Sequence, residues 1–262
     1  MVLFPRNRFS LTDERRPGAL SGRLRSAASD LVDITTYMQS LTPGLYWKCN
    51  DAGASPPDPV LDYSGNDYTG VSDPGMTHEV AGPSAQIPLA IRSSLNTHEI
   101  DVADKPEFTP GTAFTVMLWG KLTYNSIKQL CGQYTAAGGY AWYIHNDTVT
   151  SKMKVLVTED HVFTNYKVYK GSVDCIDGTW HHIAFTWDNG VLKLYVDGVE
   201  DTVITKQQDD AMTTINDATG PMVLCSTING GGTTGDYAEY AVFQKVLTPA
   251  EMLAVYTNGG GV

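Results

Sequence analysis

The stretch DGTWHHIAFTWDNGVLKLYVDGVE, Asp177–Glu200, decides the fold. Apolar and polar residues alternate on both sides of Asp188-Asn189-Gly190, and again on both sides of Asp197-Gly198. Asn-Gly and Asp-Gly pairs between alternating runs are the strongest short-range hairpin signals, because both central residues of the favoured turn need positive φ. The stretch therefore predicts strands joined by two successive tight turns.

The strand Trp180–Trp187 within this stretch carries almost no charge. Successive side chains of a strand point to opposite faces, so His182 and Ala184 share one face while Ile183 and Phe185 share the other. Both faces are largely uncharged. We therefore expect a second sheet or loops to cover this strand on both sides.

The chain from about Gln86 to Phe243 continues in short alternating runs separated by turn residues. More than ten such strands are expected, which is typical of a sandwich or barrel. The segment Ala54–Gly70 is too rich in Pro, Gly, Asp and Asn to be regular for most of its length. These patterns predict an all-β domain with one long loop near its start.

Two short helices are expected to flank the strands. Apolar residues spaced as on a helix face predict a lead-in helix at about 29–41, capped by Ser29 or Asp30 and ended by Pro43-Gly44. Thr248-Pro249-Ala250-Glu251 is a capping box with proline at the first helical position, so a second helix should run to Asn258-Gly259.

Four blocks of the sequence resemble one family, the laminin-G-like or concanavalin-A-like jelly rolls of the kind found in phage virion proteins. They are TTYMQSLTPGLYWKCNDAG followed by LDYSGNDYTG (35–70), FTVMLWGKL (114–122), the hairpin block (177–200) and EYAVFQKVLTPAEMLAVY (239–256). The hairpin block is the most specific, and the other blocks occur in the family's order. The resemblance implies a two-sheet antiparallel jelly-roll sandwich over residues 29–262.

The first 28 residues lie outside this resemblance and differ in charge. The arm 1–28 carries a net charge of +4, which leaves −15 for the rest of a chain with −11 overall. An acidic domain repels nucleic acid. The arm is either a solvated tail or a basic docking arm that orders on an acidic partner, and its apolar residues favour docking. The arginines expected to dock are Arg6, Arg8, Arg15, Arg16, Arg23 and Arg25.

The resemblance also implies a candidate calcium site on the rim of the sandwich. The Asp/Asn loop contributes hard oxygen ligands, and acidic residues of the last strand lie nearby in the expected fold. Ala238 occupies the place of the family's last-strand aspartate. The alternative is a turn in which the Asp and Asn side chains bond their own backbone. The candidate ligands are Asp62, Asn66, Asp67, Asp236 and Glu239.

Aromatic residues offer a candidate glycan site. Sugar binding uses aromatic rings beside polar groups, and Trp142, Tyr143 and Tyr134 come from neighbouring segments. Strand alternation requires either Trp142 or Tyr143 to face outward. The alternative is that these rings pack in the core or between subunits.

Catalysis is not expected, and no residue is assigned to it. Glu99-Ile100-Asp101-Val102-Ala103-Asp104 partly matches the Glu-x-Asp-x-x-Glu strand of laminarinase-type hydrolases, but Asp104 is one methylene too short for the acid/base role. His181 and His182 are adjacent on a strand, so they point to opposite faces and cannot bind one ion from one side.

These observations favour a non-enzymatic virion structural protein of a tailed phage, such as a capsid decoration or a head or tail fibre component. The arm would contact other virion proteins, the sandwich would face outward on the virion surface, and the protein would form a homo-oligomer. The alternative is a carbohydrate-binding, lectin-like module that binds a host surface glycan, and a glycoside hydrolase ranks last. No cofactor other than calcium is expected. The sequence shows neither a secretory signal nor an 18-residue apolar run, and its four cysteines favour buried free thiols.

Overall fold

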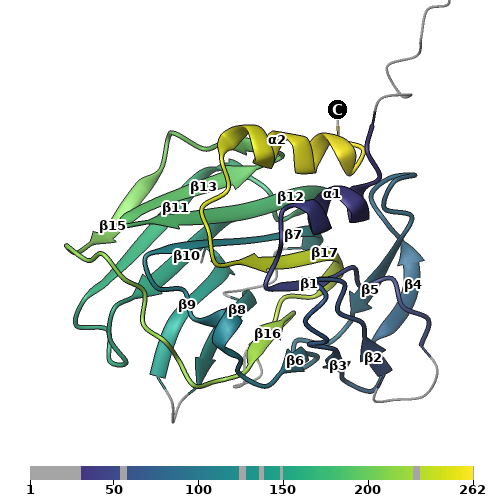
Figure 1. Cartoon of the computed structure of the whole chain (residues 1–262), viewed down its shortest axis with the longest axis horizontal. Helices are drawn as coiled ribbons and strands as arrows, with labels where there is room; N and C mark the ends of the chain where they lie inside the picture. Colours follow the sequence, from purple (N-terminus) through teal and green to yellow (C-terminus); the bar gives the residue numbers. More distant parts are fainter. Residues whose placement is uncertain are drawn as a thin grey trace, which may run out of the picture. The chain divides into compact units, whose positions relative to one another are not determined.

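The computed structural model describes residues 31–53, 58–123, 128–135, 139–147, 150–226 and 231–261, and only the backbone of Tyr134 and Thr135. Within these ranges the chain forms two antiparallel sheets and two α-helices (Figure 1). The two-sheet jelly-roll sandwich expected from the sequence is confirmed.

The first sheet, sheet A, contains eight strands within the described ranges, and β12 lies between β13 and β7 near its centre. A short strand, β1, pairs with β17 beside this path. The order along the sheet is β14 (Val199–Glu200), β13 (Val191–Val196), β12 (Asp177–Asp188), β7 (Ala113–Thr123), β17 (Gly235–Phe243), β5 (Leu89–Ser93) and β4 (Thr77–Ala81), with β1 at Leu45–Trp47.

The second sheet, sheet B, contains nine strands in the described part of the chain. Its edge strand β2 was not expected from the sequence, because Pro59 and its neighbours read as loop. Proline is tolerated in an edge strand, where its missing N–H faces away from the ladder. The order is β15 (Thr205–Asp209), β11 (Tyr166–Asp174), β10 (Lys152–Thr158), β9 (Gly139–Asn146), β8 (Gln129–Thr135), β16 (Met222–Leu224), β6 (Ile100–Val102), β3 (Gly70–Ser72) and β2 (Asp58–Val60).

The two turns of the hairpin block have the geometry expected from their residues. Asn189 and Gly190 have φ values of 45° and 98°, and Asp197 and Gly198 have 52° and 75°. A Cβ on Gly190 would lie 2.4 Å from the carbonyl oxygen of Met212. Glycine is therefore required there both by the backbone angle and by the close approach of another segment.

The core is divided by sheet A into two layers. Ile183, Phe185 and Trp187 of β12 belong to the large cluster between the sheets. Ala184 belongs to a second cluster on the other face of sheet A, where the helices contribute Met38 and other apolar residues. Both faces of β12 are covered, as expected, and the outer cover consists of helices rather than loops (Figure 1).

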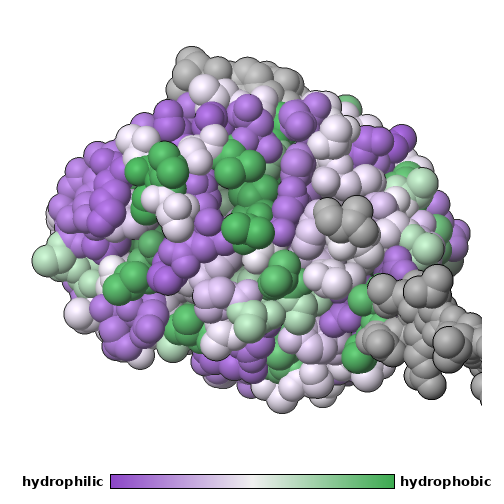
Figure 2. Space-filling model, turned by 90° about the horizontal axis from the view of Figure 1, so that it is seen from above, coloured by the Kyte–Doolittle hydropathy of each residue, from purple (hydrophilic) through white to green (hydrophobic). Residues whose placement is uncertain are grey.

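Both helices lie on the outer face of sheet A. Helix α1 (Ile34–Ser40) begins later than expected, with Asp33 as its N-cap; Ser29 and Asp30 lie outside the described residues. Helix α2 (Pro249–Asn258) has the predicted capping box between Thr248 and Glu251. Seen from this side, exposed apolar groups are small and separated by polar ones (Figure 2).

All four cysteines are buried and free, which confirms the expectation from the sequence. Burial raises the pKa of each thiol, and that of Cys175 to about 12. Such thiols are poor nucleophiles at neutral pH, because the thiolate is the reactive form. The cysteines therefore serve packing.

Candidate functional site

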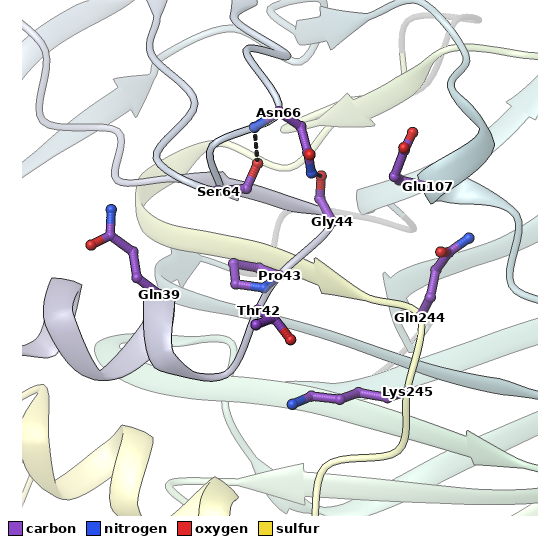
Figure 3. Close-up of a pocket in the computed structure, with 9 residues that line it drawn as sticks. All are labelled: Gln39, Thr42, Pro43, Gly44, Ser64, Asn66, Glu107, Gln244 and Lys245. Atoms are coloured by element: carbon purple, nitrogen blue, oxygen red, sulfur yellow. Dashed lines mark hydrogen bonds between the residues drawn. The ribbon is translucent and has the colours of Figure 1, made fainter.

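A polar cleft of about 380 Å³ opens on the rim of the sandwich (Figure 3). It lies where the turn after α1, the loop after Asp62, the 3₁₀ turn η2 (Pro106–Phe108) and the end of β17 meet. In Figure 3, Gln39 lies on one side of the central Thr42–Gly44 segment, and Glu107 and Gln244 lie on the other. The lining residues are Gln39, Thr42, Pro43, Gly44, Ser64, Asn66, Glu107, Gln244 and Lys245.

Three amide side chains of this cleft are oriented by backbone carbonyls. Each donates its N–H group to a carbonyl oxygen, and within the described residues each amide oxygen has no protein partner. An amide tied in this way offers a fixed hydrogen-bond acceptor. The three bonds are Gln39 to Tyr63 (3.0 Å), Asn66 to Gly44 (3.0 Å) and Gln244 to Pro106 (2.8 Å).

One carboxylate and one ammonium group complete the lining. The hydroxyl of Tyr68 donates to Glu107 over 2.6 Å, which leaves the second carboxylate oxygen of Glu107 as a further acceptor. Lys245 adds a positively charged ammonium group, which can only donate hydrogen bonds. The charges offset one another, so the cleft suits an uncharged ligand that carries several hydroxyl groups. Isolated amide and charged residues form no recognisable sequence motif. Gln39, Gln244 and Lys245 were therefore not predicted as site residues from the sequence.

The loop that begins at Asp62 satisfies its own backbone. The Asp62 carboxylate accepts hydrogen bonds from the backbone N–H groups of Tyr46, Ser64 and Tyr68 at 2.9–3.0 Å, and from the Ser64 hydroxyl at 2.6 Å. Asn66 is held by Gly44 and Ser64. This is the Asx-turn arrangement that the sequence left as the alternative to calcium binding.

The two candidate ligands on β17 are engaged elsewhere. Asp236 receives a two-pronged interaction from Arg92, at 2.6 and 2.9 Å. Glu239 lies at a break in the β17–β7 register with a φ of 52°, and it accepts a hydrogen bond from the Tyr46 hydroxyl. Burial raises the pKa of Glu239 to about 7. Each carboxylate therefore already has a protein partner.

The described residues contain no group of three or more His, Cys, Asp or Glu side chains arranged to hold a metal ion. Asp67, with a φ of 61°, is exposed on the same loop as Asp62. The carboxylates of Asp62, Asp236 and Glu239 make separate sets of contacts. Calcium binding at these residues stays a prediction.

The aromatic residues named for glycan binding face different ways. Trp142 is fully buried between the sheets, 5.7 Å from Phe114 and 5.5 Å from Phe185 between ring centroids. The expectation that Trp142 contacts a glycan is therefore wrong. Tyr143 is half-buried on the outer face of sheet B, edge-on to His145 at 5.2 Å. The side chain of Tyr134 lies outside the described part of the chain.

The acidic residues around β6 form two separate groups. Burial raises the pKa of Glu99 to about 7, with further contributions from Asp101 and Asp73. Asp104 instead accepts a hydrogen bond from Gln133 at 2.8 Å, and its pKa is raised by burial and by Asp217. Glu99 and Asp104 thus have different charged neighbours, and the geometry gives no support for a retaining pair.

The six arginines of the arm lie outside the described residues. Neither described helix is long and apolar enough to cross a bilayer. Docking by Arg6, Arg8, Arg15, Arg16, Arg23 and Arg25 stays a prediction.

A laminin-G family model, described as the concanavalin A-like lectin/glucanases superfamily, matches residues 95–252, more than half of the chain. The chain belongs to this family. The matched region includes the β12–β13 hairpin, Glu107 of the cleft, the whole of β17 and the first turn of α2. No curated protein matches the chain in sequence.

Similar solved structures are binding domains of bacterial toxins. One is the binding domain of Paraclostridial Mosquitocidal Protein 1, with a TM-score of 0.61 and 15% identity over 84% of this chain and 52% of that chain. Another is the ligand binding domain of Botulinum neurotoxin serotype D in complex with N-acetylneuraminic acid, with a TM-score of 0.60 and 14% identity over 84% and 52%. At such identities the likeness concerns the fold, and this chain spans about half the length of those structures.

Proposed function

We propose that this family member is a non-catalytic binding module that holds a neutral, hydroxyl-rich ligand, a glycan, in the polar cleft. The three amides tied to backbone carbonyls carry the proposal, because they present acceptors that need no reordering when hydroxyl groups bind. The superfamily's description, which names lectins, and the sugar in one neighbour's structure support a glycan as the ligand. The neutral charge of the ligand is inferred from the cleft alone, because N-acetylneuraminic acid is anionic.

Glycan-array binding followed by calorimetry on the full chain tests the proposal. Gln244→Leu removes one oriented acceptor and should weaken binding of an array hit about tenfold, since a buried sugar hydroxyl then lacks its partner. Gln207→Leu on the exposed side of β15 is the matched control and should change nothing. Equal affinity of both variants, or no hit on the array, would count against the cleft.

The non-catalytic part of the proposal rests on the separate surroundings of Glu99 and Asp104. Incubation with β-glucans should release no reducing sugar. Hydrolysis that Glu99→Gln abolishes would contradict it.

We infer a second function, that of a virion structural protein of a tailed phage anchored by residues 1–28, from the separation of charge between the arm (+4) and the rest of the chain (−15). Opposite charges allow the arm to bind an acidic partner while the sandwich remains soluble. The chain lacking residues 1–28 should stay folded but no longer assemble on virion proteins. If it still assembles, the arm is not the anchor.

A further inference from the structure

The loop between β10 and β11 holds three aromatic rings together at one end of the strands of sheet B. The ring centroid of Phe163 lies 4.1 Å from that of Tyr140 and 5.8 Å from that of Tyr166. All three side chains are half-buried, and the neighbouring Val162 is 70% exposed. We call these three residues the aromatic tip.

The carboxylate of Asp160 organises this loop. It accepts hydrogen bonds from the backbone N–H groups of Val162, Thr164 and Asn165 at 3.0–3.2 Å, and also from the Thr164 hydroxyl. Burial works to raise the pKa of Asp160, but these hydrogen bonds and one from Thr158 outweigh it, so the pKa is lowered. The loop is thereby fixed before any ligand arrives.

The backbone of Phe163 is strained. Its φ is 56°, and no other aromatic residue in the described ranges has a positive φ. A bulky side chain in this region costs on the order of 1–2 kcal/mol relative to glycine. Glycine would be the relaxed choice, so a phenyl ring at this position points to a role beyond closing the turn.

Polar groups with free hydrogen-bonding capacity surround the rings. The side-chain amide of Asn216 donates to the backbone carbonyl of Tyr140 at 2.9 Å and contacts Nδ1 of His161 at 2.8 Å. The amide oxygens of Asn216 and Asn165, Nε2 of His161 and the hydroxyl of Tyr166 have no partner within the described part of the chain. Aromatic faces next to such groups suit a pyranose ring.

We propose that the aromatic tip is a second ligand site, distinct from the cleft, that stacks on the apolar face of a neutral pyranose. The charges of the loop, Glu159 and Asp160, are acidic, and the segment 156–166 contains no lysine or arginine. Anionic sugars are therefore disfavoured at this site by like charge. The proposal stands whether or not the cleft binds a glycan.

The test is saturation-transfer NMR and calorimetry on the full chain, with maltohexaose, cellohexaose and chitohexaose as neutral probes and 3′-sialyllactose as the anionic probe. At least one neutral probe should bind. Phe163→Ala should weaken it by about fivefold to tenfold, as expected for the loss of one ring contact, and Phe163→Trp should retain binding. Phe163→Ala should weaken binding by the same factor in a Gln244→Leu background, which separates this site from the cleft.

Phe163→Gly distinguishes ligand binding from packing. Glycine relieves the backbone angle, so the melting temperature should stay equal or rise while binding is lost. A lowered melting temperature would show that the ring serves only to pack the loop, which overturns the proposal. Failure of every neutral probe, preference for 3′-sialyllactose, or unchanged affinity of Phe163→Ala would also overturn it.

Discussion

The hairpins β12–β13 and β10–β11 place different kinds of residue at the positive φ angles of their turns. The β12–β13 turn, Asn189-Gly190, takes positive φ with residues that tolerate it, and its strand β12 lies at the centre of sheet A. The β10–β11 turn takes positive φ at Phe163 and needs the Asp160 carboxylate to hold it. The first turn is relaxed and serves folding. The second stores backbone strain at Phe163, which the proposed ligand site at the aromatic tip would account for.

The largest expected effect is at the relaxed turn. Gly190→Ala forces both an unfavourable φ and a contact of 2.4 Å with the Met212 carbonyl oxygen, so we expect a loss of about 3 kcal/mol in the free energy of unfolding. Chemical denaturation measures it. Gly65→Ala is the control, because Gly65 also has positive φ but nothing within 4 Å, and it should cost about 1 kcal/mol. Equal losses of unfolding free energy in the two variants would mean that the contact with the Met212 carbonyl oxygen does not contribute to the cost of Gly190→Ala.

An intermediate effect is expected at the strained turn. Asp160→Asn keeps the shape of the side chain but weakens several charge-assisted hydrogen bonds, so we expect a loss of about 1–2 kcal/mol. Hydrogen exchange of the amides of residues 162–165 should accelerate. Asp174→Asn, whose side chain is 63% exposed and 3.9 Å from Lys152, should change stability by less than about 0.5 kcal/mol. Unchanged exchange in Asp160→Asn would show that the loop is held by other contacts.

The smallest expected effect is a pH dependence of stability. It should have opposite signs for His181 of the β12–β13 hairpin and Asp160 of the β10–β11 hairpin. The hydrogen bond from His181 to Asp197 (2.8 Å) raises the pKa of His181 in the folded protein, so its stabilising contribution is complete at acidic pH and is lost as pH rises through the raised pKa. The pKa of Asp160 is lowered, so its contribution is complete at neutral pH and is lost on acidification.

Melting temperatures of His181→Gln and Asp160→Asn, each compared with the unmodified chain from pH 3 to pH 9, measure these two slopes. Each difference should vary by no more than about 2 °C across the range. Slopes of the same sign for both variants would contradict the assignment of the two shifts.

The same contrast explains what could be predicted from the sequence. The β12–β13 block was predictable because turn chemistry and strand alternation are local properties of Asp177–Glu200. Alternation also required one of Trp142 and Tyr143 to face outward, but which one depends on where Phe114 and Phe185 pack.

The candidate sites depend on long-range contacts that no local pattern carries. The aromatic tip brings Tyr140 to Phe163 across two strands, and the cleft joins Gln39 to Gln244 from opposite ends of the chain. The family resemblance, together with the residue types of the loop at Asp62, predicts a candidate ion site there. The backbone hydrogen bonds of this loop became visible only in the fold.

The burial of all four native thiols has a practical consequence for fluorescence work on the tip. Their raised pKa values and their burial keep them unreactive toward maleimide dyes under native conditions. Val162→Cys would therefore place a single reactive thiol at a position that is 70% exposed in the unmodified chain, next to the strained ring of Phe163. A dye there would report on ligand arrival without any native cysteine having to be removed.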